Sequence, residues 1–289
     1  SALIRSPYPN DFFGHPISLK EAEAQGDDFF TFLGVRNLSE ARSLDARFML
    51  QKYNEYVQNH PRMMTVHDNR ICYGDPLLLF ALGKHLDVPM ITGNTPDEFV
   101  IGIKAESDKM YKQKVQEIFG VKADQFLSFN EAWTFDANAG YAAIDSIECT
   151  AKCLLRKSQE QGRTSNCYYY QFKPHIPGWD MPGAFHSSEL WFVFETLAKC
   201  WRPFQGYHYD LARKMCNYWA NFVKTGDPNG LDQDGSPLPE WKPYTKETPH
   251  RMFFASEGPL TQNNNETAFM QFLINSIAEN ILKGKKEEL

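Results

Sequence analysis

The sequence lacks both a long apolar run and an excess of basic residues, and each absence excludes a class of protein. No stretch of the 289 residues approaches the ~20 consecutive apolar residues that a membrane-spanning helix needs. The chain carries 30 Lys and Arg against 36 Asp and Glu, a formal net charge of −6, and its one short basic segment lies at residues 283–286. Neither a membrane span nor a nucleic-acid partner is therefore expected.

Cysteine is also scarce, and the six cysteines are scattered rather than arranged as a metal-binding motif. Cys149 and Cys153 lie four residues apart on a predicted helix, which is half of a metal-binding pattern. No Cys-x-x-Cys or paired His motif accompanies them, so the sequence predicts buried free thiols and no metal. Free thiols favour a reducing compartment such as the cytoplasm, with secretion as the alternative.

Apolar residues make up 42% of the chain, which is enough for a sizeable core, and no repeat or linker divides it. One domain over residues 1–289 is therefore expected. Apolar spacing and capping residues predict helices over residues 17–35, 39–61, 76–84, 107–120, 144–161, 190–197, 207–224 and 264–284. Short apolar or aromatic runs predict strands over residues 2–5, 88–91, 167–172 and 251–254.

The aromatic strand 167–172 leads into a loop that carries a histidine among small residues. Such a loop can present the imidazole of His186 at the C-terminal rim of a sheet, where α/β enzymes place their reactive groups. One His among eight does not by itself indicate a site, because most are surface or core residues. His175, the rival in the same loop, lacks small neighbours and is expected at the surface. Glu189 is expected to be a structural hydrogen-bond partner.

A second loop supplies a carboxylate at the same rim. The strand 88–91 is followed by Gly93, Asp97 and Glu98, and Pro96 fits the first turn of a helix. An acid after one strand, followed 88 residues later by His186, matches the chain order Ser, Asp or Glu, His of α/β-hydrolases. Asp97 could instead be an anion at the start of the helix, facing its macrodipole.

These motifs and two others resemble the type B carboxylesterase and cholinesterase-like esterase family. The resemblance covers nearly the whole chain and is carried by Gly-Ala-Phe-His and Ser-Glu-Leu at residues 183–190, Gly-Asn and Asp-Glu at residues 93–98, the segments 218–222 and 225–229, Trp241 and Tyr244. It implies an α/β-hydrolase fold, of which this chain is the C-terminal portion of a mostly parallel sheet flanked by helices. Residues 1–289 would then be the later part of one catalytic domain.

The resemblance also assigns roles to individual residues. His186 matches the catalytic base of the family, and Glu98 rather than Asp97 matches its acid. Phe99 stands where many members have Gly, which predicts an altered angle for the Glu98 carboxylate. Ser6 matches a serine that supports the acid, although an ordinary Ser at a strand end is equally expected.

The sequence has no serine that matches the nucleophile of such an esterase. None of its Ser residues stands in a G-x-S-x-G turn, and it has no Gly-Gly pair for an oxyanion hole. The resemblance places both in an N-terminal half outside this chain, which becomes its expected partner. The expected function is hydrolysis of a small-molecule carboxylic ester by a Ser-His-Glu triad, to which this chain contributes His186 and Glu98 without a cofactor.

One consequence follows from that expectation, and two alternatives remain beside it. The chain alone is expected to be inactive, because it holds no nucleophile. One alternative is an inactive esterase-like protein used for binding or adhesion. The other is an enzyme with a thiol nucleophile such as Cys149, although no pattern places that thiol beside His186.

Overall fold

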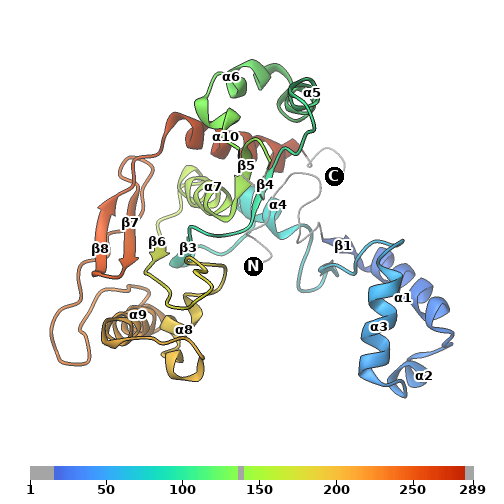
Figure 1. Ribbon diagram of the computed structural model, residues 1–289, viewed down its shortest axis with the longest axis horizontal. Coiled ribbons are helices and arrows are strands. Elements are labelled where there is room, and N and C mark those ends of the chain that lie inside the picture. The colour runs from blue at the N-terminus through green and yellow to red at the C-terminus, as the bar shows by residue number, and fades with distance from the viewer. Residues whose placement is uncertain (1–15, 136–139, 284–289) are drawn as a thin grey trace. The chain divides into compact units, whose positions relative to one another are not determined.

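The computed structural model describes residues 16–135 and 140–283, which divide into two compact units, residues 1–79 and 80–289 (Figure 1). The strand predicted at residues 2–5 and the neighbouring Ser6 lie outside the described residues. A short helix, α4 (Pro76–Ala81), runs across the boundary between the units and ends three residues before the helix predicted there.

The first unit is a small group of helices with one short pair of parallel strands. Its elements are β1 (Ile17–Ser18), α1 (Leu19–Leu33), α2 (Leu38–Arg42), α3 (Ala46–Tyr56) and β2 (Val66–His67). The predicted first helix is confirmed and begins at a capping box formed by Ser18 and Glu21. The prediction of one helix over residues 39–61 is wrong, because the side chain of Asp45 accepts two backbone amide protons and starts α3 there.

The second unit is built on a four-stranded sheet in the order β3-β6-β7-β8. Its strands are β3 (Met90–Asn94), β6 (Cys167–Lys173), β7 (His250–Ala255) and β8 (Gly258–Asn263). The first three strands are parallel, and only the β7–β8 pair is antiparallel. The three predicted strands of this region and the mostly parallel sheet are confirmed. β8 was not predicted, and it begins directly after a tight turn, at Gly258, which has a φ of 112°.

Helices cover both faces of this sheet (Figure 1). Successive residues of a strand point to opposite faces, and the aromatic residues of β6 follow this rule. Tyr168 and Phe172 pack in a core with Met215 of α9 (Gly206–Thr225), whereas Tyr169 lies under Lys152 of α7 (Ile147–Glu160). α10 (Ala268–Lys283) packs against α7 on that second face. Burial on both faces explains why three aromatic residues follow one another in β6 instead of alternating with polar residues.

Two helices follow the predicted limits closely. α5 (Asp108–Phe119) begins after its cap Ser107 and ends at Gly120. α9 ends at Gly226, whose φ of 78° is the left-handed conformation expected after a helix. Residues 123–127 form a further short helix, α6 (Ala123–Leu127).

Other limits differ from the prediction, each for a local reason. The helix predicted from residue 144 starts later, because β5 (Ala143–Ser146) pairs with β4 (Val100–Gly102) and Ser146 caps α7. α8 (Leu190–Val193) is a single turn instead of a helix to residue 197, since the backbone turns at Glu195 with a φ of 48°. The last helix is capped by Thr267, whose hydroxyl accepts the amide proton of Met270, and not by the predicted asparagines.

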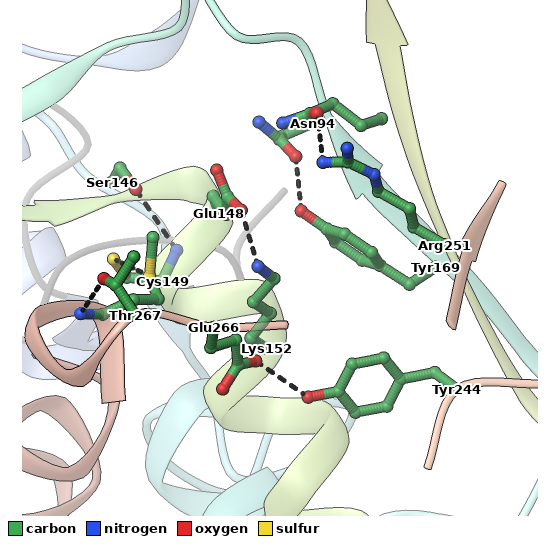
Figure 2. Close-up of polar contacts among 12 residues, drawn as sticks. Asn94, Ser146, Glu148, Cys149, Lys152, Tyr169, Tyr244, Arg251, Glu266 and Thr267 are labelled. Carbon is green, nitrogen blue, oxygen red and sulfur yellow. Dashed lines mark hydrogen bonds and ion pairs between the residues drawn. The ribbon is translucent and has the colours of Figure 1, made fainter. Parts of the chain in front are cut away.

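A group of polar contacts is enclosed on the α7 face of the sheet, and Figure 2 shows it. Lys152 is 1% exposed, and its ammonium pairs with Glu148 at 2.6 Å and lies 5.4 Å from the centre of the Tyr169 ring. Glu148 and Lys152 are four residues apart on α7, which places them side by side. The Tyr169 hydroxyl donates to Asn94 at the end of β3. A buried lysine is thus held by one helix neighbour and one aromatic face.

All six cysteines are free thiols, and burial raises the pKa of both Cys149 and Cys153 to about 12. Cys149, Cys153 and Cys167 are buried, whereas the other three are partly exposed. Among the described residues, no group of three or more His, Cys, Asp and Glu side chains could hold a metal ion. In the same part of the chain, every helix is too short or too polar to cross a membrane.

Candidate active site

The two predicted site residues lie on loops that leave one edge of the sheet. β3 and β6 are parallel neighbours, and their last paired residues are Asn94 and Gln171. Glu98 follows the end of β3 and His186 follows the end of β6, so both loops start from the same carboxyl edge. The structure brings the side chains together, with His186 Nδ1 2.6 Å from Glu98 Oε2.

The two side chains of this pair are exposed to very different degrees. The Glu98 side chain is 8% exposed, whereas the His186 side chain is 41% exposed. A carboxylate only accepts hydrogen bonds, so an ionised Glu98 fixes the proton of the imidazole on Nδ1. Nε2 is then the nitrogen that can take up a proton from a reacting group. The arrangement therefore consists of an accessible imidazole held by a covered carboxylate.

Asp97 has a role that the sequence analysis did not predict. The helix expected from residue 96 does not form, and the assignment of Asp97 as a helix-start anion is wrong. Instead, Asp97 Oδ2 accepts the amide proton of Ala184 at 2.8 Å, and the Asp97 amide donates to the Ala184 carbonyl at 3.3 Å. This contact joins the two loops, because Asp97 lies one residue before Glu98 and Ala184 lies two residues before His186.

The glycine in this contact has a clear steric reason. Gly183 has a φ of 65°, a conformation that other residues adopt only with strain. A Cβ atom at this position would lie 2.4 Å from Asp97 Oδ2, which is well inside van der Waals contact. Gly183 is therefore needed for the close approach of Asp97 to the loop before His186.

The turn after His186 is equally tight. Ser187 has a φ of 67°, and the Ser188 amide donates to the Phe185 carbonyl at 3.0 Å. Ser188 is fully buried. A short, compact turn therefore fixes where the backbone of His186 lies between the sheet and α8.

Two aromatic residues complete the surroundings of the pair. The Phe99 ring lies 4.8 Å from the His186 ring at an interplanar angle of 41°, and the residue is 49% exposed. With Phe99 at this position, the carboxylate of Glu98 still reaches the imidazole. Tyr170 of β6 donates its hydroxyl to Glu189 Oε1 at 3.5 Å. Tyr170 could have been anticipated from the alternation of β6, which points it to the same face as Tyr168.

Glu189 occupies a largely enclosed position close to the pair. Burial raises the pKa of Glu189, and the negative charge of Glu98 raises it further, while the positive charge of His186 lowers it. Its contact with Tyr170 agrees with the expected structural hydrogen bond. His175 is exposed, as predicted, and its amide donates to Ser256 at the start of the turn between β7 and β8.

The late motif residues serve the core and not the site. Trp241 is fully buried, and its indole NH donates to the Tyr169 carbonyl at 3.2 Å. The side chain of Asn229 accepts the Trp241 amide proton at 2.7 Å and donates to its carbonyl at 3.0 Å. Asn229 therefore fixes the backbone at Trp241 by two contacts, and the Trp241 indole in turn contacts β6.

Comparison with known proteins agrees with this fold. Two solved structures of PNB esterases are similar: one gives a TM-score of 0.60 at 19% identity, and a thermophilic one gives 0.57 at 18%. Each comparison covers 89% of this chain and 55% of the esterase chain. At such identities the similarity defines the fold class, which is the α/β-hydrolase fold.

The sequence comparisons go one step further. A model of the carboxylesterase family matches residues 137–273. Bile salt-activated lipase of Rattus norvegicus is 31% identical over 280 residues, which are 86% of this chain and 45% of that protein. Carboxylesterase 4A of Bos taurus is 35% identical over 224 residues, 74% of this chain and 32% of that protein. The chain belongs to the carboxylesterase family, and it spans less than half the length of these curated relatives.

Proposed function

We propose that this chain contributes the histidine and the acid of a serine carboxylesterase. The observation that carries the proposal is the 2.6 Å contact between His186 and Glu98 at the carboxyl edge of the sheet. The order acid, then base along the chain and the family membership support it. The substrate would be a small-molecule carboxylic ester, and no metal or cofactor takes part in the proposed reaction.

In the proposed reaction, the nucleophilic serine and the oxyanion donors come from a segment outside this chain. His186 Nε2 takes the proton from the serine hydroxyl while the serine oxygen bonds to the ester carbonyl carbon. The same proton then passes from Nε2 to the alcohol oxygen as the bond between carbonyl carbon and alcohol breaks. Glu98 stays ionised throughout, because its role is to orient the ring and stabilise the imidazolium. Water then cleaves the acyl-serine by the reverse proton transfers.

The experiment compares two histidine variants in a protein that joins this chain to the upstream segment of its relatives. His186→Ala should lower kcat by roughly three orders of magnitude or more, because the base acts as a unit with the nucleophile. His175→Ala is the matched control, since His175 lies exposed on the same loop, and it should leave kcat within about twofold. Full turnover in His186→Ala would reject the proposal and assign the role of the base to another residue, with His175 tested next.

A second measurement separates the contribution of this chain from that of the upstream segment. The isolated chain should show no burst of product with an activated phenyl ester, because none of the serines in its sequence stands in a G-x-S-x-G turn. The protein joined to the upstream segment should show a burst. A stoichiometric burst from the isolated chain would mean that the nucleophile lies within these 289 residues.

A further inference from the structure

The loop that carries Glu98 leaves the sheet through a hydrogen-bonded side chain. Asn94 is the last residue of β3, and both Asn94 and the following Thr95 are buried. Asn94 Nδ2 donates to the Thr95 carbonyl at 2.8 Å, and this carbonyl belongs to the peptide bond before Pro96. The side chain of Asn94 therefore fixes the direction in which the chain leaves β3, four residues before the acid.

Tyr169 holds the other end of the same amide. Tyr169 is paired with Thr92 in the parallel strands β3 and β6, and its hydroxyl reaches along β3 to Asn94 Oδ1 (Figure 2). The Thr95 carbonyl can only accept, so the nitrogen of the Asn94 amide faces it and the oxygen faces the Tyr169 hydroxyl. The hydroxyl must therefore donate. Burial raises the pKa of Tyr169 well above its ordinary value, so the phenol keeps the proton that it donates.

We infer that Tyr169 is a positioning residue, which places Glu98 against His186 by acting through Asn94. The inference rests on the proposed function, because it needs Glu98 to be the acid of the reaction, and it adds the residue that sets the position of this acid. Tyr169 and Asn94 are already buried in this chain. Covering the carboxyl edge of the sheet with a further segment therefore leaves their contact inside the protein.

The position of the acid depends on how its loop is held at both ends. Tyr169 and Asn94 hold the start of the loop, and Asp97 holds its end through the Ala184 amide at 2.8 Å. Glu98 follows directly and reaches the imidazole over only 2.6 Å. A catalytic group displaced by about 1 Å can lower a rate by about 100-fold. Losing one of two anchors should displace the acid less than losing both, so a smaller but measurable fall is expected.

The first variant is Tyr169→Phe in the protein that joins this chain to the upstream segment. It keeps the ring and leaves Asn94 Oδ1 buried without its donor, which favours a different position of the amide. We expect kcat for an activated phenyl ester to fall about tenfold, because the acid is displaced. KM should stay within about twofold, because no contact with the ester is removed.

Tyr244→Phe is the matched control. Tyr244 is also buried on the α7 face and its ring centre lies 6.1 Å from that of Tyr169, but its hydroxyl donates to Glu266 (Figure 2). The variant thus removes a buried hydroxyl next to Tyr169 without touching the amide of Asn94. We expect kcat per folded molecule to stay within about twofold.

A double-variant cycle with Glu98→Gln distinguishes positioning of the acid from a general loosening of the sheet. If Tyr169 acts through Glu98, adding Tyr169→Phe to Glu98→Gln should lower kcat by less than about twofold, because the position of the lost acid no longer matters. A general loosening would lower kcat by the same factor with and without Glu98→Gln, and this result would overturn the inference.

Asn94→Asp tests the same contact from its other side. A carboxylate still accepts from the Tyr169 hydroxyl, but it has no proton to donate to the Thr95 carbonyl. We expect at least the tenfold fall of Tyr169→Phe, and again almost no further fall when Glu98→Gln is present. Unchanged kcat in Asn94→Asp would overturn the inference.

The cycle also distinguishes failure of the inference from failure of the proposed function. Unchanged kcat in Tyr169→Phe, together with a severe loss in Glu98→Gln and His186→Ala, would overturn the inference and leave the proposed function standing. Near-normal turnover in Glu98→Gln itself would overturn both, since no acid would then need a position. If the unmodified joined protein cleaves no activated ester, both fail as well.

Discussion

Two carboxylate–base pairs in the second unit have the same 2.6 Å contact and opposite exposure. In the Glu98–His186 pair, the acid side chain is 8% exposed and the base 41%. In the Glu148–Lys152 pair, the acid is 21% exposed and the base 2%. A base that exchanges protons with a substrate must be reachable, and only the first pair meets this condition. The second pair instead encloses its positive charge, which is a structural arrangement.

The pairs also differ in how the chain assembles them. Glu148 and Lys152 are neighbours on one helix, so their contact needs only α7 to form. Glu98 and His186 are 88 residues apart and meet only because β3 and β6 pair in parallel and Asp97 joins their loops. The long-range pair therefore depends on the whole sheet, whereas the local pair does not.

The largest effect that separates the pairs should come from removing one carboxylate charge at a time. Glu98→Gln should lower kcat of the joined enzyme by about ten thousand-fold, because an amide can hold the wrong imidazole tautomer. Glu148→Gln makes the same chemical change in the other pair and should leave kcat per folded molecule nearly unchanged. Steady-state kinetics on both variants checks this, and near-normal turnover in Glu98→Gln would transfer the role of the acid to Asp97.

The same two variants should differ in the opposite sense when the free energy of unfolding is measured, with Glu148→Gln losing more stability than Glu98→Gln. Glu148→Gln leaves the enclosed ammonium of Lys152 without its anion and should cost about 3 kcal/mol in the free energy of unfolding. Adding Lys152→Met to this variant removes the unpaired charge and keeps the volume, so the double variant should recover most of the loss. Urea denaturation followed by tryptophan fluorescence suits this test, because all six Trp residues lie within residues 80–289. If Glu148→Gln were as stable as Glu98→Gln, the buried lysine would need no partner.

A smaller effect is expected where the two loops of the active pair meet. Gly183→Ala should cost about 1–3 kcal/mol, because Ala is strained at a φ of 65° and its Cβ would displace Asp97 from the Ala184 amide. We expect kcat to fall as well, by roughly 10- to 100-fold, since the position of His186 depends on this contact. Gly206→Ala is the matched control, because a Cβ there meets no atom within 4 Å. If both variants behave alike, the contact of Asp97 does not position the loop.

The smallest effect concerns pH and the third carboxyl near the pair. Burial raises the pKa of Glu189 above its ordinary value of 4.5. A raised value in the folded state means that the associated stability is complete below pH 4.5 and is lost as the pH rises through the folded value. Each pH unit between the two values corresponds to about 1.4 kcal/mol. Glu189→Gln should therefore be as stable as the unmodified chain at pH 4 and more stable than it at pH 7. Urea denaturation at both pH values measures this difference. The same dependence of the free energy of unfolding on pH in both proteins would contradict the expectation.

The sequence predicted those parts of the fold in which local signals and tertiary structure agree. The helix over residues 206–225 has apolar residues at helical spacing, which are buried in the structure, and a glycine that ends it as predicted. The aromatic strand at 167–172 was equally clear. β8 was missed because it contains Gly and Pro and becomes a strand only by pairing with β7.

The site was predicted in part for the same reason. The order of strands and the small residues beside His186 indicated where acid and base would lie. The role of Asp97 could not be predicted, because Pro96 is a local helix-start signal and the extended path appears only when Asp97 pairs with the histidine loop. Tertiary pairing thus overrode a local preference at the residue next to the acid.

The most direct test of the Glu98–His186 pair needs no enzymatic activity. Long-range ¹H–¹⁵N NMR spectra of this chain near pH 8 report which ring nitrogen of His186 carries the proton. We expect the neutral ring to carry it on Nδ1, because an ionised Glu98 accepts from that atom, and we expect Glu98→Gln to shift the ring toward Nε2 or a mixture. A proton on Nε2 in the unmodified chain, or the same tautomer in both proteins, would contradict the pairing on which the proposed function depends.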